Sequence, residues 1–131
     1  MSESLSKDPY VAAFPEIAEF WRAAARQEFL IPQCADCGEA HWFPRPTCPF
    51  CRSGSIRWKR ASGRATLHTY TVLDSPSGST LLAYVRLQEG PLMLTNIIDT
   101  DAGALCIDMP LQVTFRRTEE GRDAPVFVIA S

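Results

Sequence analysis

Residues 34–51 read CADCGEAHWFPRPTCPFC and hold four of the five cysteines of the chain. The four form two Cys-x-x-Cys pairs, Cys34 with Cys37 and Cys48 with Cys51, with ten residues between them. A Cys-x-x-Cys turn places two sulfurs on one side of a tight knuckle, and two facing knuckles bring four thiolates to the corners of a tetrahedron. The stretch therefore predicts a structural metal site with all four ligand positions filled by protein.

Zinc is the metal that this ligand set favours, although iron in a rubredoxin-like cage fits the same four sulfurs. A redox dithiol is the main alternative, but a redox motif does not need a second pair at ribbon spacing. His41 lies between the pairs and is predicted to be a surface residue or a neighbour of the ligands, not a ligand. The fifth cysteine, Cys106, lies in the apolar run ALCI and is predicted to be a small buried hydrophobe.

Length and composition bound the class of protein. The chain has 131 residues, of which 46% are hydrophobic, enough for one ordinary domain or a small module on a modest core. No apolar run approaches the ~18 residues that a membrane span needs, and the first residues contain no apolar stretch of signal-peptide length. We therefore expect a cytoplasmic protein without a membrane partner, and a cytoplasmic protein uses paired cysteines for metal more often than for disulfides.

The segments on either side of the cysteines predict a mainly β fold. Residues 14–29 place Ile17, Phe20, Trp21 and Ala24 on one helical face, a stripe that covers either the protein's own core or a partner. Five strand candidates with turn residues between them follow the cysteines, which is typical of a five-stranded Greek-key barrel, the OB-fold. The predicted division is a helical segment at 1–30, a zinc ribbon at 31–60 and a barrel at 61–131.

Charge is unevenly distributed along the chain. The formal net charge is −2, from −2 over residues 1–33, +4 over residues 34–66 and −4 over residues 67–131. The basic middle third could face a phosphate or a polyanion, or be an ordinary solvated surface. No serine or acid partner is placed by spacing near either His41 or His68, and there is no nucleophile–base signature. The sequence does not favour an enzyme that acts alone.

The order of these parts resembles a family of small zinc-ribbon OB-fold proteins associated with acyl-CoA metabolism. The resemblance extends from about residue 14 to residue 129. The matching motifs are Phe20-Trp21, Cys34/Cys37/Gly38, Phe43-Pro44-Arg45, Cys48-Pro49 with Cys51, Trp58, Ser62-Gly63-Arg64, Glu89-Gly90, and Pro125 with Phe127.

The resemblance implies a noncatalytic auxiliary subunit. Such a subunit binds a thiolase-like or other acyl-CoA-processing enzyme and helps to bind or channel the acyl-CoA. Phe20 and Trp21 are then candidates for the partner contact, because aromatic residues anchor interfaces. The candidates for the phosphates of CoA are the basic residues Arg45, Lys59, Arg60 and Arg64.

Two other functions stay open at this point. Ribbons and OB-folds both bind nucleic acids, so a nucleic-acid-binding module is the second hypothesis. Against it, residues 67–131 are acidic overall, and Tyr70 and Tyr84 are the only clear stacking candidates on strands. The third hypothesis is an enzyme that uses Cys106 or His68 in a site without a known signature.

Overall fold

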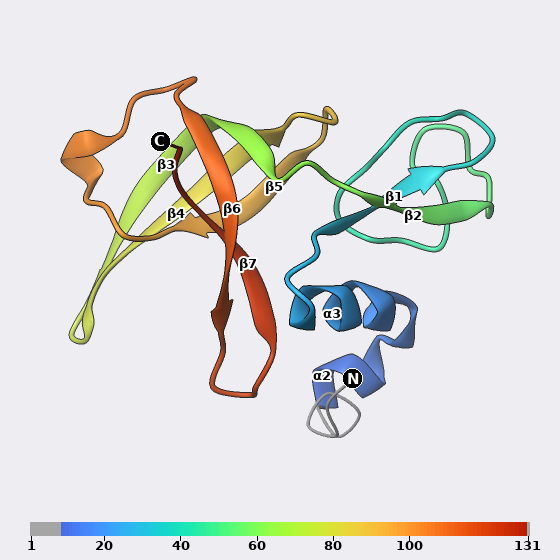
Figure 1. The fold of residues 1–131 in the computed structure, drawn as a ribbon, viewed down its shortest axis with the longest axis horizontal. Coiled ribbons are helices and arrows are strands. Elements are labelled where there is room, and N and C mark those ends of the chain that lie inside the picture. The colour runs from blue at the N-terminus through green and yellow to red at the C-terminus, as the bar shows by residue number, and fades with distance from the viewer. Residues whose placement is uncertain (1–8, 131) are drawn as a thin grey trace.

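The structure is a computed structural model that describes residues 9–130 (Figure 1). It begins with the short helix α2 (Pro9–Ala13), a 3-10 turn η1 (Pro15–Ile17) and the helix α3 (Ala18–Ala25). The helix predicted over residues 14–29 is therefore shorter, and it ends where Gln27 takes a left-handed φ of 64°. Within residues 9–130 no helix has both the length and the apolar character needed to cross a membrane.

The ribbon follows as a two-stranded antiparallel sheet. Strand β1 (Leu30–Cys34) pairs with β2 (Ile56–Arg60), and Leu30 lies opposite Arg60. The loop between the two strands carries three of the four paired cysteines, and the fourth, Cys34, ends β1. A ribbon of this size has almost no core of its own, so its shape depends on cross-links and on what it packs against.

Five strands then form a closed barrel: β3 (Arg64–Ser75), β4 (Gly78–Leu87), β5 (Leu92–Ile97), β6 (Pro110–Arg117) and β7 (Asp123–Ile129). A 3-10 turn, η2 (Ala102–Ala104), lies between β5 and β6. The strand order is β3-β4-β5-β7-β6, and β6 pairs back onto the start of β3. This order confirms the predicted fold class of an N-terminal helix, a ribbon and a five-stranded OB-fold barrel.

One strand candidate, residues 55–73, is divided between the two sheets. Its first part forms β2 of the ribbon and its second part begins β3 of the barrel. The break falls at Gly63, which has a φ of 81° and lies so close to β6 that an added Cβ would be 2.5 Å from Cγ1 of Val113. Glycine alone fits both the left-handed backbone and the close approach at this point.

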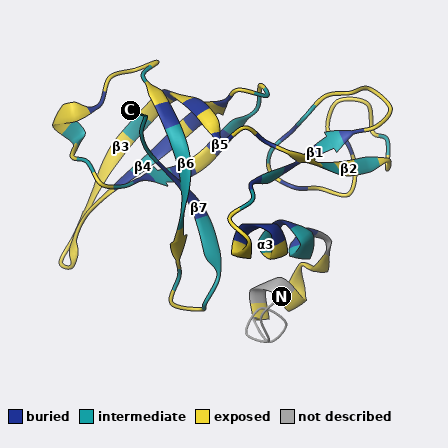
Figure 2. Ribbon diagram, viewed as in Figure 1, coloured by how far each residue is buried: buried dark blue, intermediate teal, exposed yellow. Residues whose placement is uncertain are grey.

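The alternation of buried and exposed side chains along the strands defines the barrel core. In β4 the side chains of Leu81, Ala83, Val85 and Leu87 are buried and alternate with less buried ones, the pattern of a strand with one face in the core (Figure 2). Leu111 of β6 and Phe127 of β7 are also fully enclosed.

An aromatic cluster joins the helix, the ribbon and the barrel. Phe20 of α3 is 4% exposed, and its ring centroid lies 5.2 Å from that of Trp42 and 6.5 Å from those of Trp58 and Phe29. Phe29 in turn lies 6.3 Å from Phe127 in the barrel. The apolar stripe of the helix therefore packs on the protein's own core, which was one of its two predicted roles.

Candidate functional site

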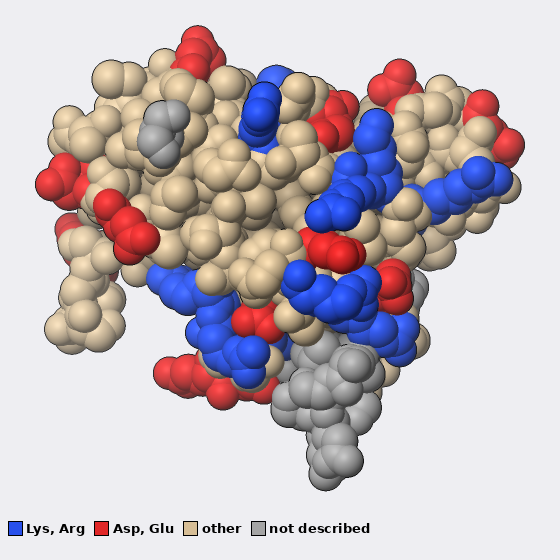
Figure 3. Space-filling model, in the orientation of Figure 1, with Lys and Arg blue, Asp and Glu red and all other residues tan. Residues whose placement is uncertain are grey.

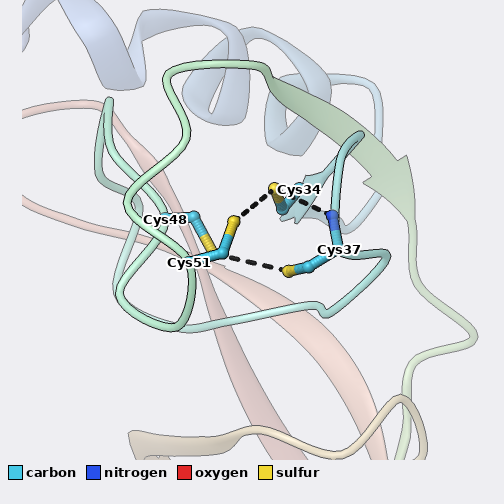
Figure 4. Close-up of side chains that lie close together, drawn as sticks. All are labelled: Cys34, Cys37, Cys48 and Cys51. Atoms are coloured by element: carbon cyan, nitrogen blue, oxygen red, sulfur yellow. Dashed lines mark hydrogen bonds between the residues drawn. The ribbon is translucent and has the colours of Figure 1, made fainter.

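The four paired cysteines converge on one point at the end of the ribbon (Figure 4). Their sulfurs all lie within 4.8 Å of one another, with 3.5 Å between Cys34 and Cys51 and 3.7 Å between Cys37 and Cys48. A regular tetrahedron around zinc, with Zn–S bonds of about 2.3 Å, has S···S edges of about 3.8 Å. The four cysteines are therefore positioned to bind a metal ion.

Each knuckle has the same local construction. The backbone N–H of Gly38 donates to the carbonyl oxygen of Cys34, and that of Arg52 donates to the carbonyl oxygen of Cys48, both at 2.9 Å. Gly38 and Arg52 both have a left-handed backbone, with φ values of 79° and 66°. The sequence supplies glycine at one of these turns and arginine at the other, so the second knuckle adopts the turn with an ordinary side chain.

Hydrogen bonds and neighbouring thiols shift the pKa values of the four cysteines in different directions. The backbone N–H of Cys37 points at the sulfur of Cys34 and, against the effect of burial, lowers the pKa of Cys34 to about 6. The backbone N–H of Ser53 lowers the pKa of Cys51, but the Cys34 sulfur and burial outweigh it and raise the pKa of Cys51 to about 12. In the folded arrangement of the four cysteines, the thiolate is therefore favoured at Cys34 and the protonated thiol at Cys51.

Metal binding is therefore expected to release protons. In an unfolded metal-free ribbon the thiols have ordinary pKa values of about 8.5, and in the folded geometry the pKa of Cys51 is raised to about 12, so in both cases thiols must lose protons at pH 7 to become ligands. The apparent affinity should rise with pH over the neutral range, because each displaced proton competes with the metal less strongly at higher pH. Calorimetric titration of the metal-free protein in buffers of different ionisation enthalpy measures the number of protons. A heat of binding independent of the buffer contradicts the expectation.

Two residues lie elsewhere than the sequence indicated. His41 is 3% exposed. Burial, and to a smaller extent the positive charge of Arg45, lowers the pKa of its imidazole below the ordinary value, which favours the neutral form at pH 7. The surface placement considered for His41 is therefore wrong. Cys106 is exposed in the turn before β6, so its prediction as a buried hydrophobe is also wrong. His68 is exposed at a register shift in β3 between Leu67 and Thr69.

A second feature is a cavity of about 650 Å³ bounded by α3, the ribbon and the barrel. Trp21 reaches it from the helix, Trp42 and Phe43 from the ribbon, and Met93 and Leu94 from β5. Two arginines, Arg45 of the ribbon and Arg116 of β6, also line it. An apolar space with a few cationic groups suits a ligand that has an apolar body and an anionic group.

The four basic residues predicted to bind phosphate do not share this cavity. Arg45 lines it, whereas Lys59 and Arg60 extend from β2 and Arg64 begins β3. Arg60 lines a separate, polar cleft of about 350 Å³. Figure 3 shows basic side chains over the ribbon, around α3 and beside the β6–β7 hairpin, interleaved with acidic ones.

The sequence did not single out several of the cavity residues. Met93 and Leu94 come from β5 and Arg116 comes from β6, and only the closure of the barrel against the ribbon brings these two strands together with Arg45. Both residues predicted for partner contact, Phe20 and Trp21, line the cavity, and Phe20 is also enclosed in the aromatic cluster. Phe20 thus offers almost no side-chain surface to a partner.

Comparison with known proteins identifies both parts of the chain. Residues 21–57 match the model of the rubredoxin-like zinc ribbon domain of ChsH2, and residues 58–116 match its C-terminal OB-fold domain. A DUF35 domain-containing scaffold protein of Methanothermobacter thermautotrophicus is 28% identical over 120 residues, which cover 85% of this chain and 90% of the relative.

Longer proteins match as well. A probable enoyl-CoA hydratase alpha subunit of Thermomonospora curvata is 31% identical over 116 residues, which cover 82% of this chain but 36% of the relative.

Among solved structures, a chain of the Ltp2-ChsH2(DUF35) aldolase matches with a TM-score of 0.78 and 27% identity, covering 88% of this chain and 95% of that one.

Proposed function

Since this chain belongs to the zinc-ribbon OB-fold family of ChsH2 and the DUF35 scaffold proteins, we propose that it is a noncatalytic auxiliary subunit of an acyl-CoA enzyme complex. Its partner is a thiolase-like or other acyl-CoA-processing enzyme. The observation that carries the proposal is the apolar cavity, with arginines in its wall, which is lined in part by the ribbon that holds the four-cysteine centre. A metal held by four protein ligands has no open position for a substrate, so the chain contributes binding and shape.

Zinc is the proposed metal, held by Cys34, Cys37, Cys48 and Cys51. The short sulfur-to-sulfur distances and the all-thiolate ligand set support it, and elemental analysis distinguishes zinc from iron. In this role the ion fixes the ribbon, and through Trp42 and Trp58 the ribbon supports the aromatic cluster.

The cavity is the proposed site of the acyl group. Its aromatic and aliphatic lining favours an apolar chain, and Arg45 is placed to meet a phosphate or another anionic group of CoA. Lys59, Arg60 and Arg64 are proposed as further contacts for the CoA phosphates, on the strands that connect the ribbon to the barrel. The relative named as an enoyl-CoA hydratase subunit supports this class of ligand.

Affinity purification tests the proposed partner. The tagged chain is isolated from its native organism, co-purifying proteins are identified by mass spectrometry, and the complex is reconstituted from purified components. We expect stoichiometric recovery of an acyl-CoA enzyme. Recovery of nucleic acid in a salt-sensitive manner, with no such enzyme, would instead support the nucleic-acid-binding hypothesis.

Binding of acyl-CoA is expected to change the tryptophan fluorescence. Trp21 and Trp42 both line the cavity, so an acyl group that enters it displaces solvent from their rings. Arg45→Ala should lose a charge-assisted hydrogen bond to the ligand, and the Kd for acyl-CoA should therefore rise roughly tenfold. Arg57→Ala, an exposed arginine of β2 that does not line the cavity, is the matched control. Equal affinities of the two variants would contradict the assignment of Arg45.

A further inference from the structure

The outer face of the sheet formed by β3, β4 and β5 has large apolar side chains in the open. Tyr84 is 44% exposed and Leu94 is 49% exposed, although the two lie directly opposite each other on neighbouring strands. The next row on the same face pairs Leu82 of β4 with Thr71 of β3. Directly opposed residues in an antiparallel sheet point to the same side, so these side chains form one continuous surface. Leu73 lies two residues beyond Thr71 in β3 and therefore on the same side. We call this surface the apolar strip and define it as Leu73, Leu82, Tyr84 and Leu94.

The strip also lacks charge. The segments 69–73, 80–85 and 92–98, which form this part of the sheet, contain no Asp, Glu, Lys or Arg, although the chain has 13 basic and 15 acidic residues. Single exposed hydrophobic residues are common on any protein. A contiguous apolar surface without charge is the type of surface that a protein partner covers.

The strip is continuous with the cavity proposed for the acyl group. Tyr84 and Leu94 line that cavity, and they also line a shallower apolar groove of about 200 Å³ that reaches Thr71 and Leu82. One edge of the strip is thus the rim of the cavity.

The other end of the strip lies on a projecting hairpin. The pairing of β4 with β5 begins at Leu81, and the end of the β3–β4 hairpin, which lies before this residue in β4, extends away from the barrel (Figure 1). Near its end Leu73 is 48% exposed, and in Figure 3 this projection carries no basic side chains. A two-stranded hairpin is marginally stable in water on its own, and it gains stability when its apolar side chains are covered.

We propose that the apolar strip is the surface on which the acyl-CoA enzyme docks. This inference rests on the proposed function. An enzyme that acts on an acyl group held in the cavity has to cover the rim, and the rim is where the strip begins. A second copy of this chain would close the cavity without bringing a catalyst to it. Nucleic acid requires cationic side chains, which these segments lack.

The test introduces a charge on the strip and compares it with the same change elsewhere. Leu94→Arg and Tyr84→Arg are the strip variants, and Ile107→Arg is the control, because Ile107 is 55% exposed and belongs to neither the strip nor the cavity. All three should retain the melting temperature of the wild-type protein, because the replaced side chains are exposed. Affinity for the reconstituted enzyme should fall at least about tenfold in the strip variants and stay within about twofold in the control.

The outcomes separate the two proposals. If the wild-type chain binds no acyl-CoA enzyme, the proposed function fails. If the wild-type chain binds the enzyme and Leu94→Arg and Tyr84→Arg bind it equally well, the docking surface alone is wrong. Light scattering provides a second readout: a wild-type dimer that becomes a monomer in Leu94→Arg would assign the strip to a second copy and overturn the inference.

Discussion

Removal of the metal is expected to unfold the ribbon and to lower the stability of the whole chain. Strands β1 and β2 form a sheet of two strands, and the loop between them is fixed mainly by the four cysteines. In small zinc modules the free energy of metal binding, about 10–16 kcal/mol, serves as the free energy of folding. Cys48→Ser should therefore abolish ribbon structure, whereas the barrel strands persist with a lower melting temperature because Trp42 and Trp58 no longer cover Phe20.

Circular dichroism and backbone amide NMR spectra distinguish the two effects, with elemental analysis of the same samples. Cys106→Ser is the control, because Cys106 is exposed and lies outside the group of four. It should leave both the metal content and the melting temperature unchanged. A melting temperature that is insensitive to a strong chelator, in a protein found to contain no metal, would show that the ribbon folds without an ion.

Replacement of Phe20 by alanine should have the second largest effect on stability. Its ring is 4% exposed and contacts aromatic residues of the ribbon as well as Phe29, which reaches Phe127 in the barrel. A buried Phe→Ala change costs about 3–5 kcal/mol of the free energy of unfolding, from lost transfer energy and the cavity left behind. Because the cluster joins the helix, the ribbon and the barrel, urea unfolding should show a lower free energy of unfolding for both the barrel and the ribbon.

Ala25→Gln provides the matched control on the same helix. Ala25 is exposed, so its replacement should change the free energy of unfolding by no more than about 0.5 kcal/mol. Phe20→Leu keeps part of the apolar volume and should lose less stability than Phe20→Ala. If Phe20→Ala is as stable as wild type, the helix is not held through this ring. Any loss of partner capture in Phe20→Ala then has to be judged against Phe20→Leu, because misfolding alone produces such a loss.

The sequence predicted most of the architecture because its signals are local. The spacing of Cys34, Cys37, Cys48 and Cys51 is a property of two short turns, and the alternation of Leu81, Ala83, Val85 and Leu87 is a property of one strand. Such patterns depend only on residues that are close in the sequence, so they can be recognised without knowledge of the fold. The stripe on α3 was likewise visible, although its target could not be deduced.

Features that depend on contacts between distant segments were missed. Arg116 joins Arg45 in the cavity wall only because β6 closes the barrel beside the ribbon. His41 was expected either at the surface or beside the ligands, and tertiary packing rules out the surface because it leaves the residue 3% exposed. Cys106 lies in an apolar run, but that run begins in a 3-10 turn and is not a strand, and within it only Leu105 is buried while Cys106 is exposed.

The barrel closes asymmetrically, and this has a consequence for its motions. Strand β4 pairs along its length with β3 and through Leu81–Arg86 with β5, whereas β5 meets β7 through the single parallel pair Ile97 and Phe127. Local opening needs the fewest broken bonds at this seam. Hydrogen exchange should therefore be faster for amides along the β5–β7 seam than for amides of β4. Such a result would show that the barrel opens locally between β5 and β7 while its other strands stay paired.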